Sequence, residues 1–68
     1  MQLLNKSKNP RTLLVKRTGN EKGQQVTVNP GSSITLPDDK NITIYDTLNM
    51  TEIRKKPRIV INRDGMFE

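Results

Sequence analysis

The sequence predicts an all-β protein, and three observations lead to that class. Branched side chains are abundant, with four Val, six Ile and seven Thr, while Ala is absent. Such side chains fit a pleated, half-buried surface better than a helix interior, which prefers unbranched residues and Ala. Short alternating segments recur along the chain, separated by turn-forming clusters of Gly, Pro, Asn and Asp. In 68 residues this arrangement predicts a small five-stranded sandwich or a partly open barrel.

The first predicted strand spans residues 12–18 and ends in a hairpin loop. Period-2 alternation turns Leu13 and Val15 inward. Leu14 interrupts this alternation, so it is either buried on a second face or marks a surface that a partner covers. Residues 18–23 then supply two Gly and an Asn, which is the composition of a hairpin loop, and we expect the chain to reverse there.

Three further short strands follow, each bounded by turns. Residues 24–29 alternate cleanly, and the Asn-Pro-Gly-Ser sequence at 29–32 predicts a type II turn. In such a turn Pro presets φ at the second position and Gly accepts a positive φ at the third. Residues 32–36 and 41–45 alternate in the same way, with the turn cluster of residues 36–41 between them.

Residues 46–56 are the only helix candidate. Asn49 and Glu52 have the spacing of a capping box, and Glu52 with Lys56 makes an i, i+4 pair. Pro57 would end such a helix, because the residue before a proline avoids the helical region. The segment is therefore either a helix of one or two turns or an irregular loop.

The last strand and the two chain ends complete the predicted organisation. Residues 58–63 carry an unbroken apolar triplet, which is typical of a strand covered on both faces. The chain then divides into an extended basic arm at residues 1–11, a single β domain at residues 12–63 and a C-terminal tail at residues 64–68. The expected core consists of Leu13, Val15, Val26, Val28, Ile34, Leu36, Ile42, Ile44, Ile59 and Ile61.

The composition excludes most catalytic and metal chemistry. The chain contains no His and no Cys, which removes Ser-His and Cys-His nucleophiles, an imidazole base and the usual zinc sites. Asp38 and Asp39 supply too few oxygen ligands for a calcium site, and turn formation explains them. We therefore predict a protein that is not an enzyme and has no catalytic residue, metal or cofactor.

The apolar content is low for a domain that is stable alone. Hydrophobic residues make up 31% of the chain, and a small domain without disulfides often gains stability by burying surface against a partner or copies of itself. No sequence window approaches the apolar length of a membrane span, and the first residues lack the apolar stretch of a signal peptide. We expect a soluble component of an assembly, with no membrane partner.

The excess positive charge lies in the first half of the chain. The net charge is +5, and residues 1–34 hold the whole excess, with Glu21 as their only acidic residue. The leucines and cations of the arm, with the apolar tail, predict docking on neighbouring protein subunits, where leucines enter apolar pockets and cations meet acidic surfaces. The expected partner-binding residues are Leu3, Leu4, Lys6, Lys8, Arg11 and Phe67.

The alternative function is a small basic nucleic-acid-binding module of the OB-like or SH3-like type. Residues 54–58 put four positive charges around a proline, which is typical either of a phosphate-binding patch or of a solvated loop that guards a sheet edge. Tyr45 and Phe67 are the only aromatic residues, which disfavours base stacking but allows phosphate contacts. The expected phosphate-binding residues are Lys16, Arg17, Arg54, Lys55, Lys56 and Arg58.

Two segments resemble a pattern of small β-sandwich accessory proteins in tailed-phage particles. Residues 14–18 (LVKRT) and residues 26–37 (VTVNPGSSITLP) supply a strand and hairpin that lead into a V-x-V-x-P-G-x-S turn. The resemblance implies a capsid-decoration, neck or connector protein, present in many symmetric copies of a virion. Without that role, a cytoplasmic location is expected. No functional residue of the family carries over to this chain.

Overall fold

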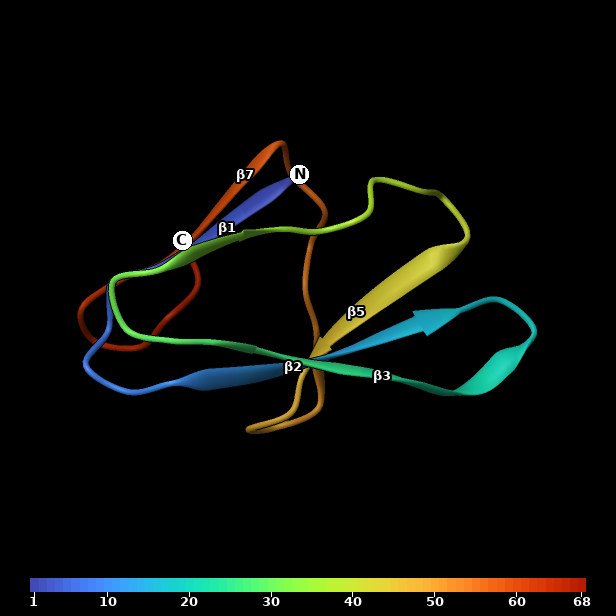
Figure 1. Cartoon of the computed structure of the whole chain (residues 1–68), viewed down its shortest axis with the longest axis horizontal. Helices are drawn as coiled ribbons and strands as arrows, with labels where there is room; N and C mark the ends of the chain where they lie inside the picture. The colour runs from blue at the N-terminus through green and yellow to red at the C-terminus, as the bar shows by residue number, and fades with distance from the viewer.

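Two β-sheets lie in separate layers in the computed structural model, which describes residues 1–68 except for the Glu21 side chain (Figure 1). The all-β prediction is confirmed, because the described residues form strands, turns and loops but no helix. The molecule measures 34 × 22 × 16 Å along its principal axes. In chain order the strands are β1 (Gln2–Asn5), β2 (Arg11–Arg17), β3 (Asn20–Val28), β4 (Ser33–Thr35), β5 (Ile42–Asp46), β6 (Thr51–Glu52) and β7 (Arg58–Ile61).

The three-stranded sheet has the order β4-β1-β7 and takes its strands from distant parts of the chain. Its central strand, β1, runs antiparallel to β4 and parallel to β7. Leu3 is aligned with Ile34 of β4 on one side and with Ile59 of β7 on the other. A bridge between Ile61 and Phe67 adds the C-terminal residues to the second edge of β7.

The four-stranded sheet has the order β3-β2-β5-β6, with every pair antiparallel. The predicted hairpin joins β2 to β3. Because Leu13 points into the core, Leu14 lies on the outer face, half-buried beside Gln25 and Tyr45. A Cβ atom on Gly23 would lie 3.0 Å from Leu14 Cδ1, and Gly23 has a φ of +68°. A glycine is therefore required at this point of the hairpin.

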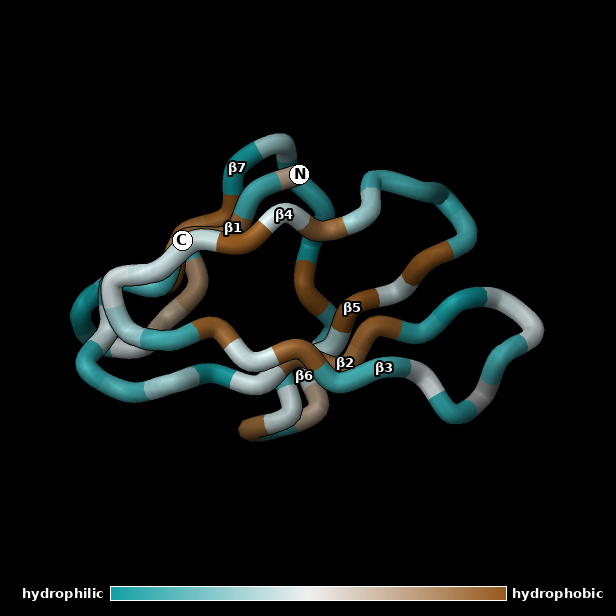
Figure 2. Tube along the Cα trace, viewed as in Figure 1, coloured by the Kyte–Doolittle hydropathy of each residue, from teal (hydrophilic) through white to brown (hydrophobic). Residues whose placement is uncertain are grey.

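The hydrophobic core lies between the two layers, and Figure 2 shows that both layers contain apolar segments. Most of the predicted core is buried, whereas Val15, Val26 and Ile34 are only half-buried. Two residues outside the predicted set, Leu3 and Ile53, complete the core. The buried apolar residues are Leu3, Leu13, Val28, Leu36, Ile42, Ile44, Ile53, Ile59 and Ile61.

Residues 1–11, predicted as an extended arm outside the β domain, instead contribute the central strand of the three-stranded sheet. Leu3 is fully buried there. The main-chain N–H of Leu36 donates to Met1 O at 2.7 Å, which continues the pairing with β4. A strand of four residues is too short to show an alternating pattern, and its partners lie far away in the sequence. Parallel pairing with β7 supplies the second row of hydrogen bonds that an arm would lack.

The helix candidate at residues 46–56 is a turn followed by a short strand. β6 pairs with β5 through Tyr45 and Glu52, and the N–H of Ile53 donates to Ile44 O at 2.8 Å. Met50 has a φ of +53°, which a right-handed helix does not allow. The segment returns along β5 because doing so buries Ile53 in the core.

A buried polar side chain, Asn5, organises the passage from β1 to β2. Its amide nitrogen donates to the carbonyls of Asn9 and Val28, both at 2.9 Å. Its Oδ1 accepts the N–H and the hydroxyl of Ser7 at 2.9 and 2.6 Å, and its carbonyl accepts the N–H of Gly31 at 2.7 Å. Asn5 is fully buried, so these bonds replace the water it loses on folding.

Replacing this side chain is expected to destabilise the fold. Asn5→Ala leaves the Ser7 and Val28 polar groups buried without their partner, which lowers the free energy of unfolding by about 2–3 kcal/mol. Urea denaturation followed by circular dichroism measures the loss. The control is Asn29→Ala, at an exposed turn position, where a change below about 0.5 kcal/mol is expected. Equal midpoints for the two variants would show that the network does not stabilise the fold.

Candidate functional site

An ion pair inside the molecule joins β2, β5 and the C-terminal residues. Arg11 Nη2 donates to Asp46 Oδ2 at 2.5 Å, and the two side chains are 10% and 4% exposed. Arg11 Nη1 donates to the carbonyl of Gly65, and its guanidinium lies 5.3 Å from the centre of the Phe67 ring. The second Asp46 oxygen accepts the N–H of Leu48 at 3.3 Å. These contacts join the start of β2 to the turn after β5 and to the C-terminal turn that contains Gly65.

The predicted partner-binding residues separate into an internal and an external group. Leu3 belongs to the core, Arg11 is held by Asp46, and Phe67 packs against the core. Leu3 and Arg11 are buried and support the fold, whereas Phe67 is half-buried and also lines a surface pocket. Lys6 and Lys8 are exposed, and Leu4 is half-buried on the outer face of β1.

The predicted phosphate-binding residues do not form one surface. Lys16 lies on the outer face of the four-stranded sheet, with its Nζ 5.7 Å from the centre of the Tyr45 ring. Arg17 Nη1 donates to Asp39 Oδ2 at 2.8 Å, and Lys55 Nζ donates to the carbonyl of Asp39 at 2.9 Å. The structure therefore brings Arg17 and Lys55 together around Asp39. The negative charge of Asp39 weakens the attraction of these two cations for a phosphate.

The other three cations of that set, Arg54, Lys56 and Arg58, line depressions that also include residues of β7. Arg54 and Lys56 line a pocket of about 310 Å³ that also contains Glu52 and Glu68. Lys56 Nζ donates to the main-chain oxygen of Glu68 at 3.2 Å. Arg58 instead lies on the outer face of the three-stranded sheet and lines a different depression.

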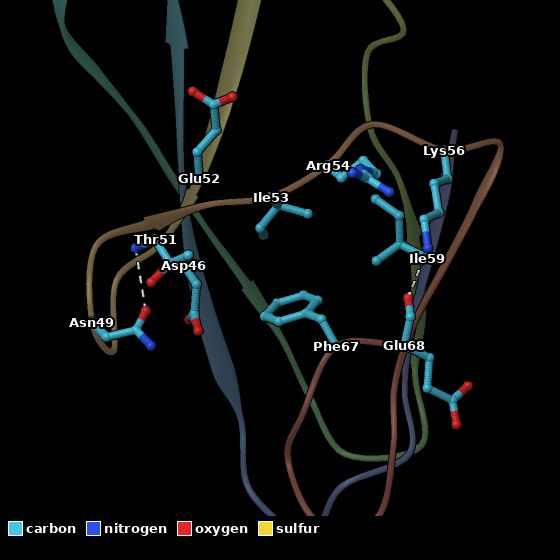
Figure 3. Close-up of a pocket in the computed structure, with 10 residues that line it drawn as sticks. All are labelled: Asp46, Asn49, Thr51, Glu52, Ile53, Arg54, Lys56, Ile59, Phe67 and Glu68. Atoms are coloured by element: carbon cyan, nitrogen blue, oxygen red, sulfur yellow. Dashed lines mark hydrogen bonds between the residues drawn. The ribbon is translucent and has the colours of Figure 1, made fainter.

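The pocket beside β6 has an apolar floor and a charged rim. Figure 3 shows Ile53, Ile59 and Phe67 directed toward its centre, with Arg54 and Lys56 along one side. The cavity contains both signs of charge. None of the described residues form a group of three metal-ligating side chains. The pocket offers a shaped apolar surface with charged groups at its rim.

A second depression of about 350 Å³ lies at one end of the sandwich, where the turn after β5 meets residues 7–11 and 63–65. Leu48 lines it together with Lys8, Arg63 and Gly65. Leu48 is 76% exposed, and Met50 of the same turn is 54% exposed. Met66, which follows Gly65, is 65% exposed. We name the surface formed by Leu48, Met50, Met66, Lys8 and Arg63 the docking end.

Sequence reasoning reached only two parts of the docking end, Lys8 and the apolar tail that contains Met66. Leu48 and Met50 lie in the segment predicted as a helix candidate, and the neighbourhood of Leu48 and Arg63 depends on contacts between distant turns. One signal was present in the sequence. Leu48 and Met50 are apolar residues in a polar stretch that fits neither strand alternation nor a helical stripe.

Comparisons with known proteins give no relative for this chain. No protein-family model, curated protein or solved structure matches it. Within the described backbone there is also no helix with the length and apolarity needed to cross a membrane. Any function must therefore be inferred from the surfaces described above.

The Arg17–Asp39 contact makes a prediction about pH. The Asn41 N–H, which donates to Asp39 Oδ1 at 2.9 Å, and the Arg17 guanidinium hold the pKa of Asp39 below its ordinary value. A carboxyl with a lowered pKa stabilises the folded state above its unfolded pKa of about 4, and this contribution is lost as pH falls through the lower folded value. NMR titration should place the Asp39 midpoint below the ordinary value for an aspartate, about 4.

Arg17→Gln is expected to raise the Asp39 midpoint toward the ordinary value, and added salt should do so partly in the parent protein. The Asn41 hydrogen bond remains in the variant, so some lowering of the pKa persists. An unchanged midpoint in Arg17→Gln would show that the guanidinium does not act on this carboxyl.

Breaking the buried ion pair is expected to have a much larger effect on stability. Arg11→Met leaves Asp46 buried without its cation and should cost about 3–5 kcal/mol of unfolding free energy. The double variant Arg11→Met/Asp46→Leu removes both charges and should regain part of that loss. The exposed pair gives the control, since Arg17→Met should cost less than about 1 kcal/mol. Urea midpoints that rank the two Arg variants equally would contradict the structural role of Arg11.

Proposed function

We propose that the protein is a non-enzymatic assembly component that docks on a partner protein through its docking end. This proposal keeps the expectation of a structural subunit but changes the docking surface. The arm residues Leu3 and Arg11 are occupied inside the molecule, whereas the turn between β5 and β6 presents apolar side chains to solvent.

The proposal rests on the exposed apolar side chains and the backbone conformation of the turn at residues 47–50. Leu48 is 76% exposed, more than the other two exposed large apolar side chains, Met50 and Met66. Met50 holds a left-handed conformation with φ at +53°, which costs a residue other than Gly roughly 1–2 kcal/mol. Exposed apolar surface and backbone strain both cluster at binding sites, and contact with a partner would bury the apolar surface of Leu48.

The charges around the turn favour a partner with an acidic rim. Lys8 and Arg63 line the same depression as Leu48, and Asp64 is the only acidic residue among its lining residues. Two copies of a chain with a net charge of +5 would bring these cations against each other. We therefore infer a different protein as the partner, with an apolar pocket for Leu48 surrounded by Asp and Glu side chains.

In its finer form the proposal is a minor virion component present in many copies. The support for this form is the turn pattern that resembles tailed-phage accessory proteins. The low apolar content of the chain also agrees with a subunit that gains stability by contact. Size-exclusion chromatography of a native lysate with light scattering, before and after nuclease treatment, tests it. Elution in a nuclease-resistant particle supports a virion component, and elution as a free monomer contradicts it.

Substitution in the turn is expected to separate docking from folding. Leu48→Glu should weaken association with the particle at least about tenfold, because it places a carboxylate against an acidic rim. Its charge-matched control is Gln25→Glu, on the exposed face of β3, which should leave association unchanged. Met50→Gly relieves the left-handed strain, so the free protein should keep its stability within about 0.5 kcal/mol or gain, yet bind less well.

A photo-crosslinking residue at position 48 identifies the surface that is contacted. The expected product joins position 48 to a partner segment that combines apolar residues with Asp or Glu. The same residue at position 25 should give no product. Equal cross-linking from both positions, or association that survives Leu48→Glu, would rule out the docking end as the contact surface.

A further inference from the structure

The outer face of the three-stranded sheet gathers residues that are far apart in the sequence. Gln2 is aligned with Arg58, and Leu4 is aligned with Val60 on one side and with Ser33 on the other. Leu3 and Ile59 point into the core. Because side chains alternate along a strand, their neighbours Gln2, Leu4, Arg58 and Val60 point outward. They line a shallow depression of about 310 Å³ together with Lys6. We name this surface the basic face.

The basic face has cations and no carboxylate among its lining residues. By contrast, Arg11 and Arg17 are each paired with a carboxylate, that of Asp46 and of Asp39 respectively. Lys6 and Arg58 are both exposed, and the described residues place no ion-pair partner within 4 Å of either. Mixed surfaces are usual in small proteins, so an unpaired cationic face indicates an anionic ligand.

The two cations lie at opposite ends of a track along β1. Arg58 is opposite Gln2, and Lys6 follows four residues later, which is about 13 Å along a strand. Between them, half-buried Leu4 and Val60 form an apolar floor. Arg binds a phosphate through paired N–H groups and Lys binds one as a point charge, while the floor offers contact to a sugar.

The geometry favours an anionic chain over an acidic peptide. Peptides that bind sheets usually do so at an edge, where unpaired main-chain groups accept an added strand. β1 is paired on both sides, so its face offers side chains and no free main-chain ladder. No aromatic residue lines the depression, which removes base stacking and leaves contacts that are independent of base sequence.

We propose that the basic face binds the sugar–phosphate backbone of a single-stranded nucleic acid, with Arg58 and Lys6 each contacting a phosphate. This function is separate from docking, since the basic face shares no residue with the docking end. It also differs from the sequence-based expectation, in which Arg58 acted with residues of the other sheet. Gln2 and Ser33 are exposed beside the track and supply neutral hydrogen-bonding groups to the same ligand.

The test measures binding of the full chain to a fluorescent twelve-nucleotide oligothymidylate by anisotropy across a salt series. Two phosphates neutralised on a single strand predict a log–log salt slope of about −1.4. Lys6→Gln/Arg58→Gln should weaken binding about tenfold at low salt and flatten the slope toward zero. The control Lys22→Gln/Lys40→Gln removes the same charge from two exposed positions, one in β3 and one in the turn before β5, and should retain at least half of the affinity.

Circular dichroism and urea midpoints establish that all variants are folded, which is expected because every substituted side chain is exposed. Absence of binding at low salt overturns the proposal, as does an equal loss in both double variants, which would report net charge alone. Tighter binding to a duplex of the same length overturns the single-strand assignment. Tighter binding to polyglutamate of equal charge would assign the face to an acidic protein. Leu48→Glu should leave oligonucleotide binding unchanged, which separates this result from the docking experiment.

Discussion

The buried contact between Arg11 and Asp46 determines how the turns at one end of the sandwich are arranged. One carboxylate oxygen of Asp46 accepts the guanidinium and the other accepts the N–H of Leu48, so the ion pair also shapes the turn that follows β5. The same guanidinium reaches the carbonyl of Gly65 and lies over Phe67. The exposed apolar side chains thus depend on a charged group inside the fold.

Buried polar groups carry much of the structural specificity in this small domain. Asn5 ends β1 and Arg11 begins β2. Each of these residues joins segments from different parts of the chain. A slip of two residues between neighbouring strands would keep apolar side chains on the core face, but it would separate a buried amide or guanidinium from its hydrogen-bond partners. With hydrophobic residues at 31% of the chain, such groups select the native pairing, and the apolar residues supply most of the free energy.

The sequence predicts the strands that alternate and fails where residues are held by distant partners. The periodicity of residues 24–29 and 41–45 matches β3 and β5 because one face of each strand packs on the core. β1 was missed because its four residues show no period and its neighbours lie more than 25 residues away. The helix candidate failed because capping-box spacing is a local signal, whereas Ile53 gains more by returning to the core beside Ile44. Single members of the docking end and the basic face, such as Lys8, Lys6 and Arg58, could be predicted as binding residues. Their grouping into two surfaces could not, since each surface joins side chains from separate turns or strands.

The parallel pairing of β1 with β7 has a consequence for synthesis on the ribosome. Leu3 and Asn5 lie in the middle of a sheet that is incomplete until residues 58–61 have left the exit tunnel. The β2–β3 hairpin can form early from local contacts, while one edge of β1 stays unpaired until β7 is available. A chain stopped before β7 would expose Leu3 and its neighbours to aggregation or proteolysis. Cells would therefore detect an incomplete copy by its first strand, not by its last.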